Sequence, residues 1–128
     1  MTTPGLTFDT GALIALERGN KRMRGVLLAA EREGLDVIVP AAVLIEWWRN
    51  GPRQRAVLDS VAVEETTERL AMLAGEAIAA VSGATPIDAL VMASAALRGD
   101  VVYTSDFGDL DQLRAHFPSV RVLSVSGG

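Results

Sequence analysis

The sequence contains no cysteine and a single histidine, His116, among its 128 residues. Without cysteine the chain cannot form a disulfide scaffold or a thiolate zinc site, and a cytoplasmic protein is the natural expectation. With one histidine it cannot be a nuclease that works through a pair of catalytic histidines. The position of His116, beside Phe117 and Pro118 at a predicted helix end, favours a structural or solvent-exposed role.

Long apolar runs and targeting signals are also missing. No apolar segment approaches the ~20 residues that a membrane-spanning helix needs, so we expect no membrane partner. The N-terminal segment MTTPGLTFDT lacks the basic and apolar regions of a signal peptide. The hydrophobic content of 49% is high enough for a substantial core. We therefore expect a single domain over residues 1–128, with its core at about 6–125 and a frayed tail at 126–128.

The net charge of −4 argues against a protein that coats nucleic acid in general. The basic residues are nevertheless unevenly distributed, because they gather in two short stretches. The first holds Arg18, Lys21, Arg22 and Arg24, and the second, which follows Glu46, holds Arg49, Arg53 and Arg55. Both stretches can be ordinary solvated helix faces. Beside an acidic metal site, they are also suited to hold a phosphate backbone.

Short β-branched runs alternate with helical patterns along the chain. The expected strands cover residues 6–9, 36–39, 61–63, 101–104 and 120–125. The expected helices cover residues 10–18, 21–33, 40–50, 52–59, 67–81, 86–98 and 108–117, and Pro40 and Pro52 open two of them. Because the strands lack period-two alternation, this order predicts an α/β fold with a parallel sheet covered on both faces. Ligands bind such sheets at the carboxyl ends of the strands, where the strand order reverses.

Two carboxylates lie where strands end. Asp9 ends the first strand and Asp106 follows a late strand, so both belong at the carboxyl edge of the predicted sheet. Either residue could instead cap the helix that begins beside it. Asp109 follows Asp106 by one helical turn, whereas Asp111 lies further along and is expected to face the solvent.

Two further acids lie on helices. Asp88 belongs to the segment ATPIDAL, a variant of the capping box with Thr85 at the N-cap. A carboxylate in the first turn of a helix can be rigidly aimed, so capping and a role in a site are compatible. Glu46 lies beside Trp47 at the border of an apolar helix face, although a plain exposed glutamate also fits the pattern. If Glu46 points inward, it needs a positive or hydrogen-bonding partner, because a buried carboxylate without one is costly.

Taken together, four or five carboxylates that converge on one cleft would repel one another strongly without a cation. Oxygen ligands in a chain without thiols suit a hard divalent cation such as Mg²⁺ or Mn²⁺. Metal-assisted phosphodiester chemistry is therefore the first hypothesis for this chain. The hydroxyls of Thr104 and Ser105 could cap a helix or hold a metal-bound water.

Four segments of the chain resemble motifs of PIN domains, and in particular of VapC-type toxins from bacterial toxin–antitoxin pairs. The segments are FDTGALIALERG, VPAAVLIEWWR, TPIDALVMASAA and VYTSDFGDLDQL. The resemblance extends over residues 6–125, and the order and spacing of the four segments together carry it. It implies a PIN-like three-layer α/β/α fold around a parallel sheet of about five strands.

The resemblance also implies a set of site residues. The positions that match the family's acidic, catalytic metal site are Asp9, Glu46, Asp88 and Asp106. Asp109 matches a further acid that supports the same metal, and Thr10, Thr104 and Ser105 match small hydroxyl positions beside it. The implied activity is endoribonuclease cleavage that depends on Mg²⁺ or Mn²⁺ and proceeds through a metal-activated water.

The implied partners are an RNA substrate, a second copy of the chain in a homodimer, and a small cognate antitoxin protein that inserts a segment into the active-site groove. The basic residues expected to hold RNA are Arg49, Arg53 and Arg55, followed by Arg18 and Arg22. Trp47 and Trp48 are adjacent, and adjacent helical residues point ~100° apart. One of the two rings is therefore expected at the surface, where it could contact the antitoxin, the dimer mate or RNA.

Other interpretations stay open, namely a PIN-domain nuclease outside a toxin–antitoxin pair and a non-catalytic PIN-like binding module. A phosphatase with an aspartate nucleophile is disfavoured, because such enzymes commonly have a second aspartate two residues after the first, where this chain has Gly11 after Asp9. A receiver-like module is disfavoured because the only lysine, Lys21, comes far too early in the chain.

Overall fold

The computed structural model of the chain describes residues 4–49 and 54–126. In chain order the elements are β1 (Leu6–Phe8), α1 (Thr10–Glu17), α2 (Lys21–Glu33), β2 (Val37–Pro40), α3 (Val43–Trp48), the 3-10 helix η1 (Arg55–Ser60), β3 (Ala62–Glu64), α4 (Glu68–Ala80), α5 (Pro86–Arg98), β4 (Val101–Thr104), α6 (Phe107–Gln112), the 3-10 helix η2 (Leu113–Ala115) and β5 (Arg121–Ser124). The predicted alternation of strands and helices is confirmed.

Within the described residues, five parallel strands form one sheet in the order β3-β2-β1-β4-β5. From the central β1 the chain steps outward to β2 and β3, and it then crosses to β4 and β5 on the other side. The strand order therefore reverses between β1 and β4, and open parallel sheets bind ligands at the carboxyl ends of such a pair. Asp9 follows β1 and Asp106 comes two residues after β4, so both acids lie at the reversal point.

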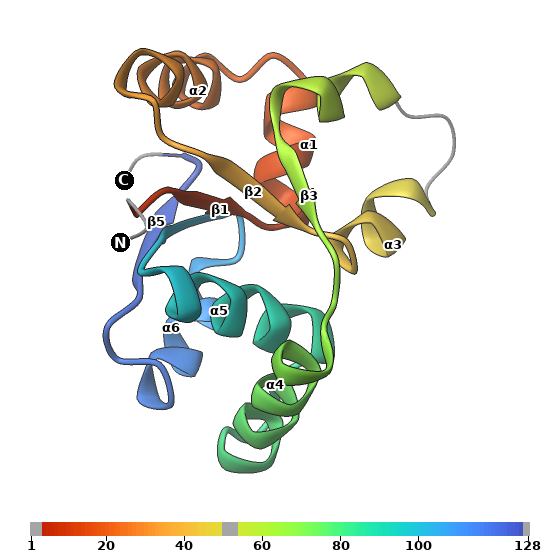
Figure 1. The fold of residues 1–128 in the computed structure, drawn as a ribbon, viewed down its shortest axis with the longest axis vertical. Helices are drawn as coiled ribbons and strands as arrows, with labels where there is room; N and C mark the ends of the chain where they lie inside the picture. The colour runs from red at the N-terminus through yellow and green to blue at the C-terminus, as the bar shows by residue number, and fades with distance from the viewer. Residues whose placement is uncertain (1–3, 50–53, 127–128) are drawn as a thin grey trace.

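Helices cover both faces of this sheet (Figure 1). On one face lie α1 and α2, which connect β1 to β2, and on the other lie α4, α5 and α6. The short α3 packs against α1 and β2. This arrangement confirms the predicted three-layer α/β/α fold.

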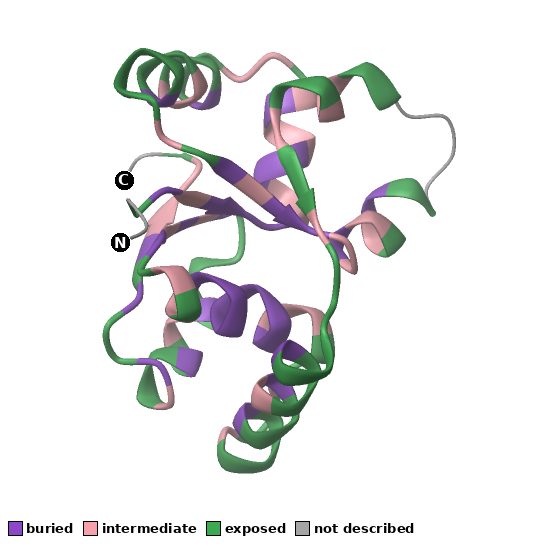
Figure 2. Ribbon diagram, viewed as in Figure 1, coloured by how far each residue is buried: buried purple, intermediate pink, exposed green. Residues whose placement is uncertain are grey.

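The helix α5 forms the buried centre of the second layer (Figure 2). Every residue in the segment 89–95 is buried, as its apolar sequence predicts. Small alanine side chains allow α5 to pack closely against α4 on one side and against β1, β2 and β4 on the other. The helix is therefore a rigid support for Asp88, which lies in its first turn. No helix in the described part of the chain is both long enough and apolar enough to cross a membrane.

Side-chain caps define where several helices begin. Asp9, Asn20, Thr67 and Thr85 each accept a hydrogen bond from the backbone N–H three residues further on. The capping role predicted for Thr85 is thereby confirmed. Asp106 occupies the N-cap position of α6, but its side chain makes no capping hydrogen bond, so the capping role considered for it is wrong.

Three of the predicted helices also differ from those in the structure. Pro40 ends β2, and α3 begins only at Val43, because a proline lacks an N–H to donate and is tolerated at the end of a strand. The predicted final helix at 108–117 divides into α6 and η2. Pro52 lies outside the described residues, and the chain that follows it forms the 3-10 helix η1 in place of an α-helix.

The two tryptophans of α3 occupy different environments. Trp47 is completely buried, whereas Trp48 is 52% exposed. Their rings still touch, with centroids 5.6 Å apart. The prediction that one ring reaches the surface is confirmed, because successive side chains of a helix diverge by ~100°.

Candidate active site

Asp9 is the most buried acid at the carboxyl edge of the sheet. Its Oδ1 accepts a hydrogen bond of 2.8 Å from the N–H of Ala12, in the first turn of α1. Its Oδ2 accepts a hydrogen bond from the hydroxyl of Thr104, the last residue of β4. Because each oxygen has a donor from a different element, the carboxylate is fixed between β1 and β4.

Thr104 connects two of the predicted acids. While its hydroxyl donates to Asp9, the same oxygen accepts a 2.8 Å hydrogen bond from the N–H of Asp106. This bond satisfies the Asp106 N–H and holds the segment after β4 beside the end of β1. The small hydroxyl side chain at position 104 therefore positions both acids.

Glu46 reaches the same region from α3. The hydroxyl of Thr10 donates a 2.8 Å hydrogen bond to Glu46 Oε1. Thr10 is the first residue of α1 and directly follows Asp9, so this bond holds the half-buried Glu46 beside the end of β1. The structure thus supplies the hydrogen-bonding partner that an inward-facing Glu46 requires.

Asp88 approaches from the other layer. It is half-buried in the first turn of α5, where its N–H donates a 3.3 Å hydrogen bond to the hydroxyl of Thr85. This capped start fixes the backbone of Asp88 relative to the sheet. The carboxylate is therefore carried on the first turn of a rigid, largely buried helix, as a ligand or catalytic group requires.

Burial and like charge both act on Asp9. The residue is 5% exposed, and burial is the largest of the causes that raise its pKa from the ordinary 3.8 to about 6. The hydrogen bonds from Thr104 and Ala12 lower this pKa, and the negative charges of Asp88 and Asp106 raise it again. A carboxylate that responds to both of these neighbours lies in one electrostatic environment with them.

The same repulsion acts on Asp88. Burial is again the largest cause that raises its pKa, and a hydrogen bond with Thr85 opposes the rise. The charges of Asp109, Glu46 and Asp106 raise it further. All the acids that the sequence placed in the site therefore interact electrostatically. Asp111 pairs instead with Arg114 at 3.3 Å, on a more exposed part of the surface.

The acids do not form a closed metal cage. Over residues 4–49 and 54–126, no three Asp, Glu or His side chains lie close enough together to hold a metal ion. The chemistry of the donors nevertheless fits a hard divalent cation, because carboxylate oxygens are the ligands that Mg²⁺ and Mn²⁺ prefer. Such a cation would also offset the repulsion that raises the pKa of Asp9 and Asp88.

Gly11 allows α1 to approach the end of β4. A Cβ built on Gly11 would lie 1.7 Å from Ser105 Oγ and 2.5 Å from Ser105 Cβ, well inside contact distance. Only glycine therefore fits here without a shift of the backbone. Sequence reasoning did not find this role, although a glycine two residues after a site aspartate is the available signal.

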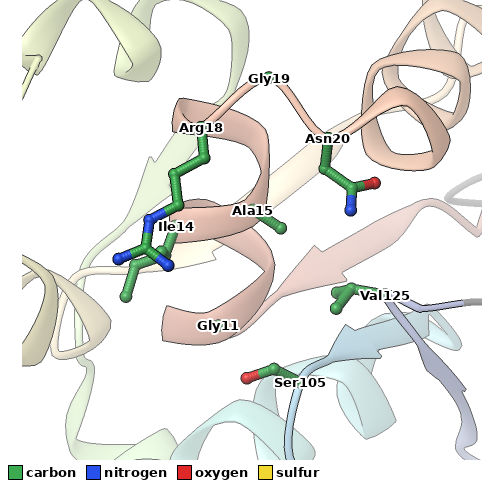
Figure 3. Close-up of a pocket in the computed structure, with 8 residues that line it drawn as sticks. All are labelled: Gly11, Ile14, Ala15, Arg18, Gly19, Asn20, Ser105 and Val125. Carbon is green, nitrogen blue, oxygen red and sulfur yellow. The ribbon is translucent and has the colours of Figure 1, made fainter.

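A pocket of about 570 Å³ opens beside this contact (Figure 3). Gly11 and Ser105 lie at one end of it, and Arg18 and Asn20 lie at the other, with the helix α1 between them. Ser105 is exposed at its rim and lies against Gly11.

The predicted basic residues are spread over several surfaces. Arg18 lines the pocket beside α1, and Arg55 lies with Trp48 in a separate depression. Arg22 donates a 3.2 Å hydrogen bond to the carbonyl of Ser124 and lies over the ring of Tyr103. Arg49 is exposed at the end of α3, and Arg53 lies outside the described residues. The structure therefore places Arg18 at the far end of the pocket from Gly11 and Ser105, and it attaches Arg22 to the end of β5.

Sequence reasoning also missed a buried ionic network between α5 and the sheet. Arg98 pairs with Glu64 at the end of β3 and with the buried Asp100, at 2.8 Å, before β4. Asp100 in turn accepts hydrogen bonds from the N–H of Gly5 at 2.7 Å and the hydroxyl of Thr7 at 2.9 Å. The network fastens the C-terminal end of α5 to the strands, so it sets the orientation of the helix that carries Asp88. No local sequence pattern signals it.

The sequence of the chain matches a known protein family over most of its length. A profile of the PIN domain matches residues 6–114, which include all the acids of the site. The chain belongs to the PIN-domain family. Proteins of this family are generally nucleases. No curated protein sequence matched the chain.

Solved structures similar to this PIN domain include three toxin–antitoxin complexes. The DNA-bound VapBC complex of Salmonella typhimurium has a TM-score of 0.73 at 14% identity, and the match covers 96% of this chain and 99% of that one. VapBC2 of Rickettsia felis, bound to a promoter fragment, has a TM-score of 0.73 at 11% identity over 93% and 97%. A toxin–antitoxin complex of Klebsiella pneumoniae has a TM-score of 0.67 at 18% identity over 94% and 98%. At such low identity these likenesses show a shared fold.

Proposed function

We propose that this PIN domain is a Mg²⁺- or Mn²⁺-dependent endoribonuclease and acts as the toxin of a toxin–antitoxin pair. The observation that carries the proposal is the buried Asp9 at the strand reversal, whose pKa is raised to about 6 by burial and by the charges of Asp88 and Asp106. These acids repel one another and lie at the ligand-binding edge of a parallel sheet. Such an arrangement is typical of a site that binds a cation.

The residues that would hold the metal are Asp9, Glu46, Asp88 and Asp106, with Asp109 in support. When bound, the divalent ion supplies a Lewis acid that lowers the pKa of water and offsets charge on the phosphodiester. Thr104 and Thr10 keep the carboxylates of Asp9 and Glu46 in place through hydrogen bonds from their hydroxyls.

The reaction that we propose is attack by water on the scissile phosphorus. It leaves a 5′-phosphate on one product and a 3′-hydroxyl on the other. We assign His116 no part in it, because it is the single histidine of the chain and packs edge-on against Phe117 after η2, with ring centroids 4.9 Å apart. A product with a 2′,3′-cyclic phosphate would contradict this chemistry.

A cognate antitoxin and a second copy of the chain are the proposed protein partners. The support is the fold shared with complexes of toxins and antitoxins from Salmonella typhimurium, Rickettsia felis and Klebsiella pneumoniae. Exposed apolar side chains on α3, Ile45 at 67% and Trp48 at 52%, are available for such contacts. A gene for a small protein directly upstream would support the pairing, and its absence would leave only the nuclease proposal.

A non-catalytic PIN-like module is the second candidate. It is favoured by the observation that no three acidic or histidine side chains within the described residues lie close enough to hold a metal. A nuclease outside a toxin–antitoxin pair is a further alternative.

Purified protein incubated with structured RNAs separates these candidates. We expect cleavage with Mg²⁺ or Mn²⁺, none with EDTA, and 5′-phosphate ends on the products. Asp9→Asn should abolish cleavage and weaken metal binding, while Asp111→Asn, an acid outside the cluster, should cleave at the wild-type rate. Cleavage by Asp9→Asn at the wild-type rate would show that the site is wrongly assigned.

A further inference from the structure

We infer that the pocket beside α1 holds one nucleotide of the RNA strand next to the scissile phosphodiester. This inference rests on the proposed function, and it names where the substrate continues beyond the acids. Gly11 lies two residues after Asp9, and Ser105 directly precedes Asp106, so one end of the pocket adjoins two of the site acids (Figure 3).

The size and lining of the pocket fit a nucleotide. Its volume of about 570 Å³ lies within the range of small-ligand sites, roughly 300–1,000 Å³. Ala15 and Val125 supply an apolar wall against which a base can pack, and Ile14 lies with Arg18 on the other side of α1 (Figure 3). No acidic side chain of the described residues lines it.

Arg18 supplies the charge that a phosphate needs. The residue is exposed, and within the described part of the chain no ion pair or hydrogen bond engages its guanidinium. The neighbouring Arg22, in contrast, already donates to the Ser124 carbonyl. An unpaired guanidinium at the edge of an open pocket is suited to bind a phosphate through two parallel hydrogen bonds.

Asn20 supplies donors for the edge of a base. Its Oδ1 accepts a 3.0 Å hydrogen bond from the N–H of Met23, and this cap fixes which side of the amide is oxygen. The two amide N–H donors therefore face away from α2. In Figure 3 the amide hangs from the turn after α1 on the side that carries Ala15 and Val125. Base carbonyls and ring nitrogens are the matching acceptors.

The charges around the site favour the pocket beside α1 as the place where the RNA strand continues. On the α6 side of the site, Asp106 and Asp109 are exposed and would repel a phosphate. On the α1 side, the pocket offers a cation and an apolar wall. A strand bound at the acids is therefore stabilised where it continues along α1. A protein segment in this pocket is the competing occupant.

The test is binding of a fluorescent single-stranded RNA by anisotropy in EDTA, which needs no cleavage. We expect Arg18→Ala to weaken binding about tenfold, as the loss of charge-assisted hydrogen bonds predicts, and to reduce the slope of log affinity against log salt by about one. Arg32→Ala, at an exposed site in the last turn of α2, is the matched control and should bind like the wild type. Ala15→Trp fills the pocket and should weaken binding without lowering the unfolding temperature.

Cleavage assays then separate this inference from the proposed function. With Mn²⁺, Arg18→Ala should raise the KM for RNA, whereas Arg32→Ala should cleave RNA with the wild-type KM. A wild type that binds RNA through Arg18 but does not cleave it would overturn the function and keep the pocket. Wild-type RNA affinity in both Arg18→Ala and Ala15→Trp, or no RNA binding by the wild type, would overturn the inference. If those variants keep wild-type RNA affinity but escape inhibition by a cognate antitoxin, the pocket takes a protein segment.

Discussion

The hydroxyl of Thr104 donates a hydrogen bond to the carboxylate of Asp9 across a sequence separation of 95 residues. This bond joins the side chains at the ends of β1 and β4, the two strands between which the strand order reverses. It also lowers the pKa of Asp9, against the larger effect of burial. One threonine hydroxyl thus connects the two strands at the reversal and also lowers the pKa of the acid between them.

Thr104→Val should raise the pKa of Asp9 further and destabilise the fold. Valine has the same shape but leaves both the Asp9 carboxylate and the Asp106 N–H without their partner, at a cost of about 1–3 kcal/mol. Urea unfolding measures the stability, and the acid limb of the pH–rate profile should shift to higher pH. Thr104→Ser keeps the hydroxyl and is the control. An unchanged pH–rate profile in Thr104→Val would mean that Thr104 does not influence the reaction.

Asp9→Asn should become progressively more stable than the wild type as the pH rises. The folded protein holds the Asp9 proton up to about pH 6, whereas the unfolded chain releases it near 3.8. Between these values the folded state binds more protons, so the wild type loses stability with rising pH, by about 3 kcal/mol in total. Asparagine does not titrate and escapes this loss.

Urea unfolding of both proteins from pH 4 to pH 7.5, with EDTA present to remove metals, measures the difference. Lost hydrogen bonds shift Asp9→Asn by a constant amount, so the slope with pH is the diagnostic quantity. A difference between the two proteins that does not change with pH would contradict the raised pKa.

Gly11→Ala should destabilise the protein by about 1–3 kcal/mol and reduce cleavage, because its methyl group would overlap Ser105. Ser105→Gly removes both overlapping side-chain atoms. The double variant should therefore recover much of the stability and activity. Thermal unfolding and initial cleavage rates measure both effects, and a double variant worse than Gly11→Ala would argue against the close approach.

Thr10→Val and Glu46→Gln should both weaken Mg²⁺ binding, and through the same contact. If the hydroxyl of Thr10 acts by holding Glu46, then the loss of Mg²⁺ affinity in the double variant should be no greater than that in Glu46→Gln alone. Calorimetric titration with Mg²⁺ gives the three affinities. Additive losses would mean that Thr10 acts independently, and wild-type affinity in Glu46→Gln would remove Glu46 from the site.

Arg98→Met should be far more destabilising than Arg114→Met. Removal of Arg98 leaves the buried Asp100 carboxylate without its cation, which typically costs about 3–5 kcal/mol. Arg114 pairs with Asp111 on a surface where both side chains are more than 40% exposed, and such pairs contribute about 0–1 kcal/mol. Urea unfolding of the two variants makes the comparison. Equal losses would show that the network beneath α5 contributes no more than a surface pair.

Local sequence patterns predicted most elements because their causes are local. The cap at Thr85, the apolar run of α5 and the β-branched strands each depend on residues within one or two turns. The errors arose where local signals compete. Proline opens helices but also ends strands, and Pro40 does the second because its neighbours pair with β3.

The candidate site was predictable only in part. Asp9 and Asp106 could be assigned to one edge of the sheet from sequence, because each follows a predicted strand. Glu46 depended on family resemblance, because its partner Thr10 lies 36 residues away on another helix. The role of Gly11 was invisible, since it depends on how closely α1 approaches Ser105.

Composition and residue order alone define the chemistry available to this protein: carboxylates without thiols, one histidine, and alternating strands and helices that must bury their apolar faces on each other. Which carboxylates meet is a property of the tertiary structure. The order β3-β2-β1-β4-β5 brings Asp9 beside Thr104, and the packing of α3 and α5 brings Glu46 and Asp88 close enough to interact with the other acids. Burial and the charges of Asp88 and Asp106 raise the pKa of Asp9. Both causes depend on which groups are close in space, and the sequence alone does not give that proximity.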